Sequence, residues 1–170
     1  MQEIVIVDGY NIIGAWPELR KLKDVELEQA RDLLIQMLAD YQAYSGARVY
    51  LVFDAHQVPG LGGRYDQNKL HIEYTREKET ADELIERLVG ELRGRRKLVY
   101  VATSDMTEQH VVFGLGALRL PARELLVKVR QSQQEVRQQI DRGGASARNT
   151  VASNMSEEMR QLFEKWRRDK

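Results

Sequence analysis

The chain has 170 residues, of which 42% are hydrophobic and 31% are charged, a mixture typical of a globular domain. This length allows one domain with a buried core, or one domain with an appendage. The absence of cysteine excludes a disulfide framework, a thiolate nucleophile and a cysteine-based zinc site. No stretch approaches the roughly 20 apolar residues of a membrane span, and no basic segment precedes the first apolar run, so we expect a cytoplasmic protein.

The formal net charge is zero, but the two halves of the chain differ in sign. Residues 1–94 carry 11 Lys and Arg against 17 Asp and Glu, whereas residues 95–170 carry 15 against 9. The basic half could hold a polyanion. Scattered solvated charge explains the same counts equally well.

The apolar pattern alternates strands with helices. A continuous apolar run at residues 3–8 predicts a buried strand, and apolar residues at helical spacing over 24–44 predict a helix that ends near Gly46. Further strands are expected at 48–53, 70–75, 98–102 and 117–120, further helices over 80–93, 106–113, 121–140 and from Asn154 onward, and polar loops over 55–69 and 142–149. These elements predict an α/β domain over residues 1–140 with a mainly parallel sheet, and a basic loop and C-terminal helix over 141–170.

Three predicted strands and one helix start carry an aspartate. Asp8 ends the first strand, Asp54 and Asp105 follow two others, and Asp82 opens the 80–93 helix. The carboxyl ends of parallel strands meet at one edge of a sheet, where ligands bind in open α/β folds. Clustered carboxylates repel one another, and a divalent cation relieves the repulsion. The pattern therefore predicts a site for Mg²⁺ or Mn²⁺, which bind carboxylates together with water and phosphate oxygens.

Each of these acids also has a purely structural explanation. Asp8 can form an Asp-Gly turn, and Asp105 can cap the helix that follows it. Asp82 stands in the first turn of a helix whose capping box would be Thr80 and Glu83, where the helix dipole favours acids. Both explanations stay open for each residue.

Asn11 strengthens the case for chemistry at Asp8. It lies about one helical turn beyond Asp8 and offers an oxygen and two N–H donors, which suits it to hold a hydrated cation and orient a phosphate. Asp54 has the weakest claim, because its continuation can simply shape the loop. There is no Walker-type phosphate loop and no GxSxG elbow, and the three histidines (His56, His71, His110) lack metal-ligand spacing.

Several of these segments resemble a known family. Residues 4–12, the triplet Thr80-Ala81-Asp82 and residues 99–105 are similar to the NYN domain, in its bacterial YacP-like branch. The resemblance extends through 53–55 and 116–117 into the C-terminal helices. It implies a PIN-like three-layer α/β/α fold with a C-terminal helical extension, and a metal-dependent endoribonuclease.

The resemblance also implies roles for individual residues. Asp8, Asp82 and Asp105 match the acidic metal-binding set, and Asn11 matches its polar partner. The YacP-like branch further implies that messenger RNA is cleaved in association with the ribosome.

An acidic centre repels phosphates, so an RNA-cleaving protein needs basic residues around it. Phosphate neutralisation gives affinity that is independent of sequence and falls steeply with salt. The candidates are Arg64, Lys69, Arg119, Arg123, Lys128, Arg130, Arg142 and Arg148, each of which is also explained as solvated surface charge. Tyr10 and Tyr65 could stack on unpaired bases, although Tyr10 could equally pack against the first helix.

Three functions fit these observations. The first is an endoribonuclease that uses Mg²⁺ or Mn²⁺ to cut single-stranded RNA, bound to the ribosome. The second is a non-catalytic RNA- or ribosome-binding module with a vestigial metal site. The third is a metal-dependent phosphatase on small molecules. The long loop over 55–69, which is expected to be mobile, fits an extended substrate better than a small molecule.

Overall fold

The computed structural model describes residues 1–55, 63–67, 69–104 and 116–150, without the side chains of 63–67 and 143–150. The chain forms two compact units, Met1–Gln133 and Gln134–Lys170. Among the described residues, no helix is both long enough and apolar enough to span a bilayer.

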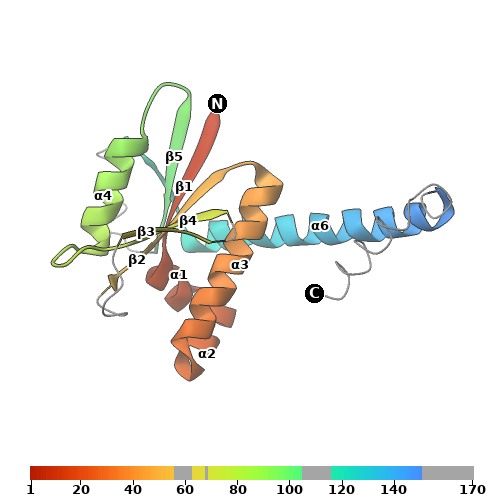
Figure 1. Ribbon diagram of the computed structural model, residues 1–170, viewed down its shortest axis with the longest axis horizontal. Coiled ribbons are helices and arrows are strands. Elements are labelled where there is room, and N and C mark those ends of the chain that lie inside the picture. The colour runs from red at the N-terminus through yellow and green to blue at the C-terminus, as the bar shows by residue number, and fades with distance from the viewer. Residues whose placement is uncertain (56–62, 68, 105–115, 151–170) are drawn as a thin grey trace. The chain divides into compact units, whose positions relative to one another are not determined.

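The first unit is built on a six-stranded sheet with the order β3-β4-β2-β1-β5-β6 (Figure 1). Five strands are parallel to one another: β1 (Gln2–Asp8), β2 (Arg48–Phe53), β4 (Leu70–Tyr74), β5 (Lys97–Ala102) and β6 (Leu118–Leu120). β3 (Gly63–Gln67) pairs antiparallel with β4 at one edge. The predicted α/β class with a mainly parallel sheet is confirmed.

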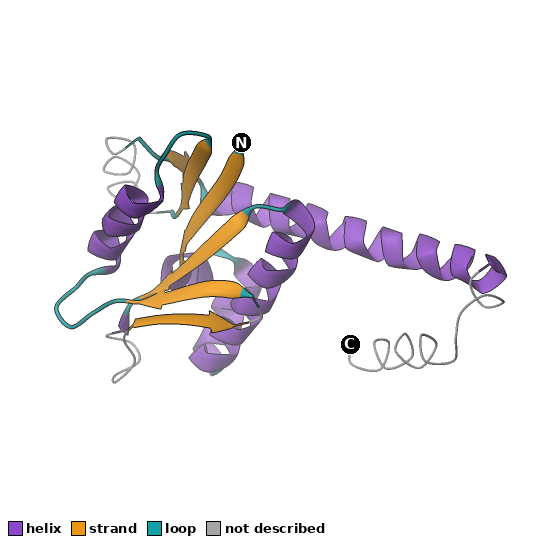
Figure 2. Ribbon diagram, turned by 45° about the horizontal axis from the view of Figure 1, so that its top comes forward, coloured by secondary structure: helices purple, strands orange, loops and turns teal. Residues whose placement is uncertain are grey.

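Helices cover both faces of the sheet, as Figure 2 shows. α1 (Gly9–Ala15), α2 (Pro17–Val25) and α3 (Leu27–Ser45) pack on one face with the start of α6 (Ala122–Thr150). α4 (Ala81–Leu92) packs on the other face. The predicted three layers are therefore present.

Several predicted boundaries are wrong, each for a local reason. The expected helix over 24–44 is two helices, because Glu26 has an extended backbone with φ −156° between α2 and α3. Gly46, with φ 76°, ends α3 at the predicted stop. The expected loop over 55–69 contains β3, a polar edge strand whose sequence shows little apolar alternation.

The C-terminal prediction also needs correction. The loop expected over 142–149 is helical, since α6 continues to Thr150. The two glycines at 143 and 144 lower helix propensity by about 1 kcal/mol each without preventing helical backbone angles. The helices expected over 106–113 and from Asn154 onward lie outside the described residues.

Candidate active site

Three neighbouring strands end at the same edge of the sheet in polar residues. β2 is followed by Asp54, β1 ends in Asp8, and β5 is followed by Thr103 and Ser104. β1 lies between β2 and β5, and the strand order reverses direction at this point. In open α/β sheets, ligands bind outside the carboxyl ends of the strands at such a reversal. This edge is the candidate active site.

Asp8 is half-buried at the end of β1, on the face of the sheet that α4 covers. Successive side chains of a strand alternate between faces, and Ile4 and Ile6 pack in the same cluster as Leu84 of α4. Asp8 also occupies the N-cap position of α1, but its side chain makes no capping hydrogen bond. Helix capping therefore does not explain this carboxylate.

Gly9 sets the direction in which the chain leaves Asp8. A Cβ built on Gly9 would lie 2.6 Å from Phe53 Cδ1 and 2.8 Å from the Val52 carbonyl oxygen. Unstrained contacts between carbon atoms lie near about 3.5–4.0 Å, so no larger side chain fits here without movement. The missing side chain lets α1 begin in contact with β2.

Asn11 joins α1 to the end of β5. The N–H and the hydroxyl of Ser104 both donate to Asn11 Oδ1, at 2.6 and 2.9 Å. Because the amide oxygen accepts both bonds, the amide nitrogen with its two N–H donors occupies the other branch of the planar group. Asn11 therefore positions the β5 end with its oxygen and can offer donors to a phosphate.

Asp82 is exposed in the first turn of α4. The Thr80 hydroxyl oxygen accepts from the Glu83 N–H at 3.1 Å, which confirms the predicted start of this helix. β4 and β5 are parallel members of one sheet, so the helix that connects them runs back and begins at the carboxyl edge. Asp82 and Asp8 thus share one edge and one face of the sheet.

Glu79, just before α4, stabilises the turn that leads into this helix. Its carboxylate accepts from Arg87 Nε and Nη2, both at 3.3 Å, and also from the Arg76 N–H at 3.0 Å. Glu79 therefore holds the turn before α4 and is already paired with a cation.

Asp54 is half-buried at the same edge, and Thr75 orients it. The Thr75 hydroxyl donates to Asp54 Oδ1 at 3.4 Å and accepts from the Ala55 N–H at 2.8 Å. The Thr75 N–H donates to the Phe53 carbonyl at 3.0 Å. These bonds hold the turn after β2 against the end of β4. Asp54 therefore has the loop-shaping task that the sequence allowed, and it adds a further carboxylate to the edge.

Tyr10 packs into the structure on the face opposite α4. Its ring centroid lies 5.0 Å from that of Phe53, which lies 5.7 Å from that of Tyr74. Burial raises the pKa of Tyr10, and the nearby Arg31 guanidinium partly opposes this. The Tyr10 hydroxyl has no hydrogen-bond geometry with any described residue, so we attribute the effect of Arg31 to its charge. The packing alternative for Tyr10 is the one observed.

Among the described residues of the first unit, the predicted RNA-binding residues do not all lie together. Arg119 of β6 and Arg123 of α6 are exposed and line a common pocket. Lys69 lies at the opposite edge of the sheet, because it immediately precedes the parallel strand β4. Lys128 is exposed with its Nζ 5.5 Å from the centroid of the Tyr100 ring. Arg130 is exposed on α6, Arg142 is exposed in the second unit, and the side chains of Arg64, Tyr65 and Arg148 lie outside the described part.

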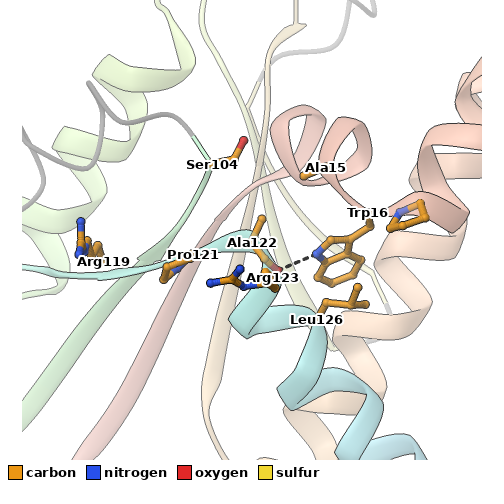
Figure 3. Close-up of a pocket in the computed structure, with 9 residues that line it drawn as sticks. Ala15, Trp16, Ser104, Arg119, Pro121, Ala122, Arg123 and Leu126 are labelled. Carbon is orange, nitrogen blue, oxygen red and sulfur yellow. Dashed lines mark hydrogen bonds between the residues drawn. The ribbon is translucent and has the colours of Figure 1, made fainter.

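The pocket beside this edge has a volume of about 620 Å³ and is shown in Figure 3. It is lined by residues from the α1–α2 corner, the end of β5, β6 and the start of α6: Ala15, Trp16, Pro17, Ser104, Arg119, Pro121, Ala122, Arg123 and Leu126. Ser104 is the residue that binds Asn11, so the pocket adjoins the candidate active site directly.

Carboxylates are ligands that a hard divalent cation takes in proteins. Mg²⁺ typically binds one or two carboxylates and completes its shell with water and phosphate oxygens. Asp8, Asp54 and Asp82 place carboxylates along this edge, but within the described residues no group of three acidic or histidine side chains could hold a metal ion. Asp105 lies outside the described residues, so its convergence with Asp8 and Asp82 stays a prediction.

A mainly parallel sheet with carboxylates at its carboxyl edge and arginines beside them is the arrangement expected for the NYN domain that the sequence resembles. The sequence matches the YacP-like NYN domain over residues 5–168, and the chain belongs to this family. The NYN domain is a nuclease-type domain, so this is a nuclease-like protein with an RNA-related role. The resemblance seen in the sequence is confirmed.

Similar proteins come from Bacillus subtilis. YacP of strain 168 is 47% identical over 166 residues, covering 98% of this chain and 97% of that protein. The crystal structure of Rae1 (YacP) matches with a TM-score of 0.75 and 46% identity, covering 97% of this chain and 94% of that one. A tryptophan-to-leucine mutant of Rae1 matches with a TM-score of 0.73 and 46% identity, over 82% and 81%.

Sequence reasoning missed two parts of the site. The pocket was not predicted, although Trp16-Pro17 marks a helix start with a large aromatic residue beside it. The role of Thr75 was also missed, because a threonine after a strand carries no distinctive signal.

Proposed function

We propose that the protein is an endoribonuclease that cleaves single-stranded RNA at the carboxyl edge of β1 with the help of Mg²⁺ or Mn²⁺. The observation that carries this proposal is the half-buried carboxylate of Asp8, which is placed by β1 and Gly9 and does not cap α1. Membership of a nuclease-type family supports the reaction class.

The residues of this chain would divide the work at the edge. Asp8 and Asp82 would hold the cation, with Asp105 as the predicted further ligand. When bound, the cation supplies a Lewis acid that activates water and neutralises phosphate charge during an in-line displacement. The Asn11 amide N–H groups would bind a non-bridging phosphate oxygen, held in place by the two bonds from Ser104.

Replacing Asp8 tests this proposal. Residues that merely orient a metal ligand typically contribute about 10- to 100-fold, so Asp8→Asn should lower single-stranded RNA cleavage by more than about 100-fold. Binding of the same RNA and the free energy of unfolding should change little. The matched control is Asp24→Asn, an exposed acid of α2. An Asp8→Asn variant that cuts RNA at the wild-type rate would refute the proposal.

A non-catalytic RNA-binding module is the second candidate. It is favoured by the finding that, within the described residues, no group of three acidic or histidine side chains could hold a metal ion. The two functions differ in a simple measurement, because the module would bind RNA without cutting it at any Mg²⁺ or Mn²⁺ concentration. That the substrate is messenger RNA and that cleavage takes place on the ribosome stay predictions from the family resemblance.

A further inference from the structure

The pocket beside the candidate active site has a fixed wall. Trp16 is 2% exposed, and its indole N–H donates to the Ala122 carbonyl at 2.8 Å, which ties the corner between α1 and α2 to the start of α6. Figure 3 shows the Trp16 indole directly beside Leu126 of α6, with Arg119 of β6 on the far side of the view. A volume of about 620 Å³ lies within the usual range of about 300–1,000 Å³ for small-molecule pockets. The Trp16 wall of the pocket is therefore held in place by the core and by this hydrogen bond.

The chemistry of the lining is uneven. Trp16, Pro121 and Leu126 give apolar walls, whereas Arg119 and Arg123 bring two positive charges, and no carboxylate lines the pocket among the described residues. A guanidinium presents a planar set of donors that matches phosphate oxygens. An apolar cavity flanked by two arginines is complementary to a flat ring that carries an anionic phosphate.

The pocket lies next to the proposed site of cleavage. Ser104 lines the pocket and donates to Asn11, and Ala15 lines it one helical turn after Asn11 on the same side of α1. Arg130 is exposed two turns after Arg123 on the same side of α6, about 10 Å further on. An RNA strand that crosses Asn11 would therefore meet the pocket and then the positive charge of Arg130.

We propose that this pocket binds the nucleotide next to the cleaved phosphodiester, with its base against the apolar wall of Pro121 and Leu126 and its phosphate on Arg119 and Arg123. The proposal rests on the proposed function and adds to it a base subsite on the α6 side of the edge. It makes RNA with bases a better ligand than a bare ribose-phosphate chain.

Binding measurements separate the two parts of this subsite. The full chain with Asp8→Asn is used, so that the RNA is not cleaved during the measurement. Fluorescence anisotropy then gives its affinity for labelled oligouridylate and for an abasic ribose-phosphate oligomer of the same length. A stacked or enclosed base contributes about 1–3 kcal/mol, so oligouridylate should bind about tenfold more tightly. Adding Ala15→Leu, which fills the pocket, should remove this preference and leave the affinity of the abasic oligomer unchanged.

Charge variants test the phosphate contacts. Arg123→Ala should weaken both oligomers by about tenfold and reduce the dependence of affinity on salt by about one unit of log–log slope. The matched control is Arg48→Ala, an exposed arginine where β2 begins, at the opposite edge of the sheet. Urea unfolding of each variant verifies that the fold is retained.

Several outcomes would overturn the proposal. Wild-type affinity of both Ala15→Leu and Arg123→Ala for oligouridylate would exclude the subsite. In that case, cleavage of oligouridylate by the wild-type protein would still support the proposed nuclease function. Oligoglutamate that displaces RNA as well as unlabelled RNA does would assign the pocket to an acidic peptide. A wild-type protein that neither binds nor cuts oligouridylate would remove the subsite and the proposed function together.

Discussion

Gly9→Ala tests whether the close approach of α1 to β2 positions Asp8. The added methyl group would lie 2.6 Å from Phe53 Cδ1 and 2.8 Å from the Val52 carbonyl oxygen. Compared with ordinary carbon contacts of about 3.5–4.0 Å, this is an overlap of about 1 Å. The Phe53 ring can rotate, but Val52 belongs to the centre of the sheet, paired with Asp8 and with Glu73, and cannot move alone.

The expected loss of stability follows from this overlap. Inserting a methyl group into a packed core typically costs about 1–3 kcal/mol, and the helix propensity gained by replacing glycine with alanine offsets at most about 1 kcal/mol. We expect Gly9→Ala to lower the free energy of unfolding by about 2 kcal/mol. A displacement of about 1 Å at a catalytic group can cost about 100-fold in rate, so RNA cleavage should fall by about that factor.

Urea denaturation and a cleavage assay under native conditions measure both effects. Gly14→Ala is the matched control, since it lies in the same helix and its Cβ would have no neighbour within 4 Å. It should leave cleavage unchanged and raise stability by up to about 1 kcal/mol. If Gly9→Ala matches Gly14→Ala in stability and rate, Gly9 does not position Asp8 and the packing argument is refuted.

Three further variants test individual contacts by urea unfolding. Thr80→Ala removes the cap of α4 and should lower the free energy of unfolding by about 1 kcal/mol. Equal stability of the variant and the wild type would contradict this. Trp16→Phe removes the indole N–H that donates to the Ala122 carbonyl and should cost about 0.5–1.5 kcal/mol; no measurable loss would mean that this bond contributes little. Burial raises the pKa of Tyr10, so the folded state holds this proton more tightly than the unfolded state, and stability should fall as the pH rises above 10 toward the folded pKa. Tyr10→Phe should reduce this alkaline loss, with a remainder from Tyr41, whose pKa burial also raises; an identical pH profile would refute the assignment.

The sequence predicted most of the sheet because buried parallel strands are continuous apolar runs. β1, β2 and β5 lie within one or two residues of their predicted places. The Thr80 cap was also visible, because a cap and its helix are neighbours in sequence. β3 escaped prediction because an edge strand is stabilised by pairing with β4 and needs no apolar pattern of its own.

The candidate site was only partly visible in the sequence. The aspartates that follow strands could be named, because parallel strands deliver their carboxyl ends to one edge. Lys69 shows the limit of such reasoning, since a basic residue near a predicted loop lies at the opposite edge once β4 is seen to be parallel to β2. The convergence of Asp105 stays a prediction.

The sequence by itself determined the α/β class, the principal strands and the acids that end them, because these depend on local apolar runs and on chain direction. Only the tertiary structure decided the bond from Ser104 to Asn11 across 93 residues, the contact of Gly9 with β2, and the pocket that Trp16 forms with α6. These contacts join segments that are far apart in the chain. Their partners are set by how the helices pack on the sheet, which no local pattern specifies.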